Sequence, residues 1–124
     1  PIFRRYFLSG YNTTTIVGGY VCITFPENHN FTSYTITGMP INNPASWTIF
    51  ASTILLSDYY YDPKGAGHIG TTDFEIISTI DSSAFPYETK RFNLSYSGSY
   101  NVYVFVYRGS DGDYPTLRGL KFWK

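Results

Sequence analysis

Short segments in which apolar and polar residues alternate recur along the chain, and they constrain its fold more than any other feature. In residues 91–96, for example, every second residue is Phe, Leu or Tyr, and Asn or Ser lies between them. Successive side chains of a β-strand point to opposite faces of a sheet, so this period of two predicts a strand buried on one side. No long window places apolar residues three and four apart, as an amphipathic helix requires. The sequence therefore predicts an all-β protein.

The predicted strands are separated by clusters of Gly, Pro, Asn and Asp, which favour turns. We expect strands at residues 21–25, 31–37, 47–57, 73–80, 91–96, 100–108 and 117–123. About seven or eight short strands at this spacing are typical of an all-β sandwich or barrel. We predict one domain over residues 1–124, an antiparallel β-sandwich that is jelly-roll-like.

Two strands near the C-terminus are expected to form a hairpin, because only the short turn-like segment Ser97-Gly98-Ser99 separates residues 91–96 from 100–108. The second strand is apolar on both faces, with Val102, Val104 and Val106 on one side. Tyr103, Phe105 and Tyr107 would lie on the other. This pattern predicts a central strand that is either covered on each side or has an exposed aromatic face.

Alternation also predicts the faces of the other strands. Residues 21–25 and 31–37 are expected to have solvated outer faces, the second one carrying Ser33, Thr35 and Thr37. In residues 73–80 one face is expected to hold the set Phe74, Ile76, Ser78 and Ile80.

Composition excludes several classes of protein. The 124 residues carry 9 Lys and Arg against 9 Asp and Glu. That balance argues against a nucleic-acid binder, which needs a surplus of positive charge. Cys22 is the single cysteine, so we expect no disulfide within the chain and read it as a small buried hydrophobe. The longest apolar run, residues 102–107, is far too short for a membrane-spanning helix. We also expect no signal peptide in this chain.

Motifs for catalysis are weak. Residues 65–70 match the dinucleotide-binding pattern G-x-G-x-x-G, but a strand-like segment follows where that motif requires a helix. His29 and His68 lie in loop-like segments without the spacing of a metal-ligand pair. The Asp111-Gly112-Asp113 segment is better explained as a turn than as a calcium site. We therefore expect a non-catalytic protein with no cofactor and no metal.

Three N-glycosylation sequons begin at Asn12, Asn30 and Asn93. Seven Asn among many Ser and Thr residues would give one or two sequons by chance, so three favour a secreted glycoprotein only slightly.

Aromatic residues make up 20% of the chain, more than one small core needs. Six rings predicted at strand ends or in loops are candidates for contacts with a ligand or partner: Trp47, Tyr59, Tyr60, Tyr61, Tyr114 and Trp123. The alternative is that these rings cover the ends of the core.

Two functions fit this sequence. The first is a structural or attachment subunit of a virion, fibre or other extracellular assembly, which forms homo-oligomers and contacts protein or glycan through exposed aromatic rings. Few charged residues and abundant hydroxyls suit a surface that is buried against neighbours. The second is a carbohydrate-binding module of a larger secreted protein. An assembly subunit would self-associate, whereas a module would be monomeric and bind sugars through one aromatic patch. We expect an extracellular or virion-surface location for the first.

Overall fold

The computed structural model describes residues 2–8, 18–38, 44–53, 74–81, 88–110 and 119–124. In residues 2–8, 18–20, 44–45 and 107–110 it describes the backbone only. All the regular elements in these ranges are strands, which confirms the all-β prediction. They are β1 (Ile2–Leu8), β2 (Gly18–His29), β3 (Ser33–Thr37), β4 (Pro44–Ser52), β5 (Glu75–Ile80), β6 (Thr89–Asn93), β7 (Tyr100–Ser110) and β8 (Lys121–Trp123).

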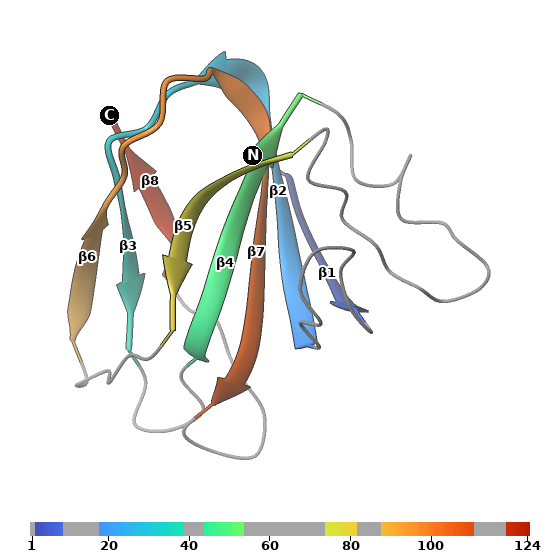
Figure 1. Cartoon of the computed structure of the whole chain (residues 1–124), viewed down its shortest axis with the longest axis vertical. Coiled ribbons are helices and arrows are strands. Elements are labelled where there is room, and N and C mark those ends of the chain that lie inside the picture. Colours follow the sequence, from blue (N-terminus) through green and yellow to red (C-terminus); the bar gives the residue numbers. More distant parts are fainter. Residues whose placement is uncertain (1, 9–17, 39–43, 54–73, 82–87, 111–118) are drawn as a thin grey trace.

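The strands form two antiparallel sheets that face each other (Figure 1). The large sheet has five strands in the order β1-β2-β7-β4-β5, and the small sheet has three in the order β6-β3-β8. The chain crosses from one sheet to the other after β2, β3, β5, β6 and β7, as in a jelly-roll-like sandwich. The predicted β-sandwich is confirmed. Within the described ranges there is no helix long and apolar enough to cross a membrane.

β7 is the central strand of the large sheet and is covered on both faces. Tyr103 and Phe105 point into the core between the sheets. Val102, Val104 and Val106 are also buried, on the opposite face, each with 1% or less of its surface exposed. This confirms the first of the two predicted environments, a central strand covered on each side.

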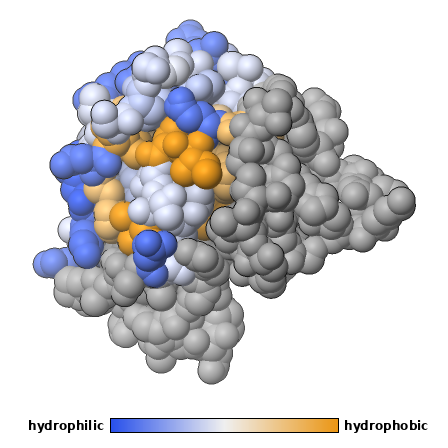
Figure 2. All heavy atoms as spheres, in the orientation of Figure 1, coloured by the Kyte–Doolittle hydropathy of each residue, from blue (hydrophilic) through white to orange (hydrophobic). Residues whose placement is uncertain are grey.

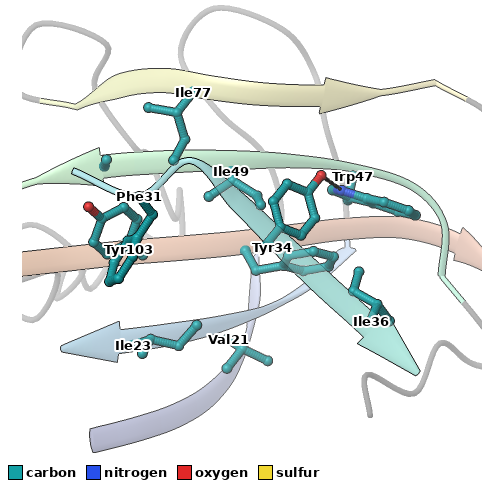
Figure 3. Close-up of a cluster of buried hydrophobic side chains, with 11 residues drawn as sticks. Val21, Ile23, Phe31, Tyr34, Ile36, Trp47, Ile49, Ile77 and Tyr103 are labelled. Carbon is teal, nitrogen blue, oxygen red and sulfur yellow. Dashed lines mark hydrogen bonds between the residues drawn. The ribbon is translucent and has the colours of Figure 1, made fainter. Parts of the chain in front are cut away.

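The core between the sheets is built largely of aromatic and β-branched side chains from both layers (Figure 3). The indole of Trp47 stacks on Phe105 with ring centroids 5.5 Å apart, and Tyr34 stacks on Phe92 at 5.1 Å. The buried members of this core are Val21, Ile23, Phe31, Tyr34, Ile36, Trp47, Ile49, Ala51, Ile77, Tyr103 and Phe105. Burial of such side chains supplies most of the stabilisation of a sandwich of this size.

The predicted hairpin of residues 91–96 and 100–108 is wrong. β6 pairs with β3 in the small sheet, whereas β7 pairs with β2 and β4 in the large sheet. Residues 94–99 cross between the layers and are fixed by a distant residue: the Asn30 Nδ2 atom donates to the carbonyls of Tyr96 (2.7 Å) and Gly98 (2.6 Å). Asn30 is 66 and 68 positions away from these two residues in the chain. Its side chain gives their carbonyls the hydrogen-bond partners that a local hairpin would otherwise provide, so the long-range contacts outweigh the local turn signal.

The predicted faces of β5 are also corrected. The β4–β5 register shifts between Ile49 and Phe50, so that Ile49 pairs with Ser78 but Phe50 pairs with Ile76. A bulge adds one residue and reverses the alternation beyond it. As a result Ile77 is in the core, whereas Ile76 is 48% exposed. Figure 2 shows hydrophobic residues in the middle of the view, along the course of β5 in Figure 1.

Two further expectations about β2 and β3 need correction. β2 does not stop at Pro26 but continues to His29. Its pairing with β7 is irregular between Thr24 and His29, which lets a proline lie within the strand. In β3, Ser33 and Thr35 were expected on a solvated face, yet each is only 4% exposed. The residues that surround the Ser33 and Thr35 hydroxyls form the candidate site.

Candidate functional site: the outer face of the small sheet

The small sheet places residues from three distant parts of the chain in rows across β3 (Figure 1). Ser33 pairs with Asn93 of β6 and with Trp123 of β8. Directly paired residues of neighbouring strands lie on the same face, and so do residues two apart along a strand. Since Tyr34 and Phe92 belong to the core, these rows lie on the outer face. We call this surface the Trp123 face and define it by Ser33, Thr35, Thr37, Thr89, Arg91, Asn93, Lys121 and Trp123.

Among the aromatic side chains whose exposure the structure describes, Trp123 is the most exposed, with 41% of its surface accessible. Its Nε1 atom donates a hydrogen bond to the Thr35 Oγ1 atom at 3.0 Å. The backbone is fixed as well, because the Trp123 carbonyl accepts from the Thr32 N–H at 2.8 Å. The indole is therefore held in one orientation while much of its surface stays open to a partner.

The guanidinium of Arg91 lies over this indole ring. Its guanidinium carbon is 5.1 Å from the centroid of the Trp123 ring, within the range of a cation–π interaction. Its Nη1 atom donates a hydrogen bond to the Ser33 Oγ atom. Ser33 and Thr35 are buried because Arg91 and Trp123 bind their hydroxyls and cover them. The two largest side chains of the face thus stabilise each other through the strand between them.

The Trp123 face is positively charged. Arg91 and Lys121 lie in the same row, paired with Thr35 from opposite sides, and both are exposed. The residues that define this face include no Asp or Glu. A guanidinium has five N–H donors, and the contacts of Arg91 with described residues are one hydrogen bond and one ring. Arg91 thus has donors available for an anionic group.

Trp47 was predicted as a surface contact residue, and its position corrects that prediction. It lies inside β4, paired with Ile80 of β5 and Tyr107 of β7, and none of its surface is exposed. Its Nε1 atom donates to the Tyr34 hydroxyl at 2.9 Å (Figure 3). Trp47 is part of the core, so it cannot meet an external partner. The other predicted rings, Tyr59, Tyr60, Tyr61 and Tyr114, lie outside the described residues.

The three sequons have different surroundings. Asn93 is exposed at the edge strand β6, in the row of Ser33 and Trp123. Asn30 is exposed too, but its side-chain nitrogen makes the two bonds that hold the crossing segment 94–99. A glycan on Nδ2 would remove one of its N–H donors, so Asn30 is better suited to a structural role than to glycosylation. Asn12 lies outside the described residues.

Residues considered for chemistry do not converge in the described part of the chain. There, no three His, Cys, Asp or Glu side chains form a group able to hold a metal ion. Cys22 is buried, as expected for a small hydrophobe. The segment 65–70, His68 and the Asp111-Gly112-Asp113 segment lie outside the described residues.

Trp123 was a candidate contact residue from the sequence, whereas Arg91 was not. Alternation in 91–96 places Phe92 inside and hence Arg91 outside, and this signal was readable. What the sequence does not show is that β6 and β8 both pair with β3, which brings Arg91 and Trp123 together across 32 positions of the chain. Comparison with models of known protein families found no match, and comparison with curated proteins found none.

Proposed function

We propose that this protein is a non-catalytic structural or attachment subunit of an extracellular assembly, such as a virion or a fibre. In this proposal the Trp123 face is the surface that meets the external partner. The observation that carries it is the fixed and exposed pair of Trp123 and Arg91.

The physical reason is the low cost of ordering such a pair. A long side chain loses about 0.5–1.5 kcal/mol of conformational freedom when a partner immobilises it. Arg91 and Trp123 are held before binding by their bonds to Ser33 and Thr35, so much of that cost is already met within the fold. Trp and Arg are also enriched among the residues that dominate binding energy at interfaces.

Self-association into a homo-oligomer is the second part of the proposal, together with a location outside the cell or on a virion surface. Only 15% of the residues are charged, which suits a surface that neighbouring subunits cover. Ile76, exposed on the edge strand β5, offers an apolar contact on the other sheet, away from the Trp123 face. Edge strands present unpaired backbone groups that a second copy can use.

A carbohydrate-binding module of a larger secreted protein is the alternative. The Trp123 face favours it as well, because an exposed indole beside fixed polar groups is suited to a sugar ring. The two functions differ in oligomeric state, since a module needs no second copy of itself.

Native mass across a concentration range tests the proposal. Light scattering on the untagged chain at physiological salt should show a trimer or a larger species, and Ile76→Ser should shift this species toward the monomer. Trp123→Ala is the matched control, because it removes the other large hydrophobic side chain that is exposed in the described part of the chain, from a surface that we assign to an outside partner. A monomer of 14.1 kDa at every concentration would overturn the assembly function and support the module.

A further inference from the structure

We propose that the Trp123 face binds a saccharide that carries a carboxylate, with the sugar ring on Trp123 and the carboxylate on Arg91. This inference rests on the proposed attachment function and names the class of ligand that the same face would take.

Arg91 provides the carboxylate site. Its guanidinium is oriented by the Nη1 bond to Ser33 and by the Trp123 ring over which it lies. No carboxylate of the described residues pairs with it. A planar guanidinium can donate two parallel N–H bonds to one carboxylate, and these charge-assisted bonds are stronger than neutral ones. The fixed orientation therefore favours a carboxylate over a neutral hydroxyl.

Trp123 provides the contact for the sugar ring. The C–H groups on one side of a pyranose form an apolar surface, which is complementary to the surface of an indole. Trp123 leaves 41% of its surface open and is anchored by its Nε1 bond to Thr35. Its ring lies 5.1 Å from the Arg91 guanidinium carbon, so one ligand residue can reach both groups.

The surrounding rows fit the rest of such a ligand. Lys121 adds a second positive charge in the row of Arg91, two strand spacings away, roughly 10 Å between backbone positions. Asn93 lies at the same separation from Trp123 and presents an exposed amide to hydroxyl groups. A neutral saccharide would leave both cations unused, and the net charge of zero argues against a nucleic acid.

The experiment uses a hexuronate oligosaccharide and a neutral oligosaccharide with the same linkage as probes. The chain is produced in bacteria so that Asn93 carries no glycan. Calorimetry should show binding of the uronate at least tenfold tighter than that of the neutral sugar, weakening as salt increases. Only two tryptophans are present and Trp47 is buried, so the change in indole fluorescence reports on Trp123.

Three variants separate the contacts. Arg91→Lys keeps the charge but loses bidentate geometry, and it should weaken uronate binding about tenfold. Trp123→Phe should weaken both sugars and abolish the fluorescence change. Lys90→Gln is the matched control. It removes a positive charge from β6, the strand of Arg91, but Lys90 lies on the opposite face of that strand, over the Phe92 ring. Its binding should equal that of the wild type.

The outcomes distinguish this inference from the function on which it rests. Equal affinity for both oligosaccharides, or no binding by an intact oligomer, would overturn the ligand class while the assembly function stands. Tight uronate binding by a strictly monomeric chain would instead overturn the assembly function and leave the ligand class standing. Equal binding of a poly-glutamate peptide would show that the face recognises carboxylates on a protein, which would also overturn the saccharide.

Discussion

The two tryptophans of this chain make the same hydrogen bond in opposite environments. The Trp47 Nε1 atom donates to Tyr34 and the Trp123 Nε1 atom donates to Thr35, at 2.9 and 3.0 Å. Tyr34 and Thr35 are successive residues of β3, so one strand accepts an indole N–H on each of its faces. Trp47 is fully buried, whereas Trp123 is 41% exposed.

The same bond therefore has different consequences on the two sides of one strand. In the core the bond satisfies an N–H group that has no access to water, so losing it is costly. On the outer face the bond is only partly buried, so losing it costs less. There the bond instead fixes the direction of a ring that remains free for binding. Stability should therefore depend on the Trp47 side, and recognition on the Trp123 side.

The largest effect is expected from Trp47→Ala. Removing a buried indole loses its packing against Phe105 and Phe92 and leaves a cavity, and such substitutions cost about 3–5 kcal/mol. Urea unfolding followed by far-UV circular dichroism measures the change. Trp123→Ala serves as the control and should cost less than about 1 kcal/mol, in line with surface substitutions. Equal losses for the two variants would remove the distinction between the faces.

Tyr34→Phe should have the next largest effect. The ring stays in place, but the hydroxyl that accepts from Trp47 and bonds to Ser78 at 2.8 Å is lost. Leaving a buried N–H without its acceptor costs about 1–3 kcal/mol. Urea unfolding followed by far-UV circular dichroism measures this change as well. A change within the experimental error would mean that the buried indole N–H has found another acceptor.

Alkaline pH should lower the free energy of unfolding through the buried tyrosines of the core. Burial raises the pKa of the Tyr34 phenol above its ordinary value of 10.0, and burial likewise raises the pKa of Tyr103. The unfolded chain releases these protons near pH 10 while the folded chain retains them. Stability is therefore full below that pH and falls above it, by at most about 1.4 kcal/mol per pH unit for each tyrosine. Unfolding curves at pH 8, 10 and 11 measure the slope, which should be shallower in Tyr34→Phe.

Thr35→Val should give the smallest change in stability. It removes the hydroxyl that accepts from Trp123 but keeps the shape and strand preference of the side chain. Because the indole is partly exposed, we expect a loss below about 1 kcal/mol in the free energy of unfolding. The bandwidth of Trp123 fluorescence and its anisotropy should report a more mobile ring. A loss as large as that of Tyr34→Phe would contradict the proposed difference between the two faces.

Much of the fold follows from local patterns, and the failures have identifiable causes. Alternation correctly placed Tyr103 and Phe105 opposite Val102, Val104 and Val106. It failed in β5, because a bulge reverses the alternation and leaves no clear mark in the sequence. The hairpin prediction failed because Asn30, far away in the chain, fixes the backbone at residues 96–98.

The candidate site divides in the same way. Trp123 and Trp47 were both candidates for surface contacts, with coverage of the core ends as the alternative, and only Trp123 is exposed. Trp47 lies in a strand with neighbours on both sides, Ile80 and Tyr107, and the sequence does not name these neighbours. Arg91 was assigned no role because its nearness to Trp123 depends on β3 lying between β6 and β8.

Local sequence patterns predict that this chain is all-β, since a period of two in hydrophobicity is a property of each strand alone. They also predict which side of a regular strand is apolar. Tertiary structure alone decided which strands are neighbours, which tryptophan is buried and which residues meet on the Trp123 face. The physical reason is that these features depend on pairing between distant segments, which arises only when the two sheets pack together and bury their shared core.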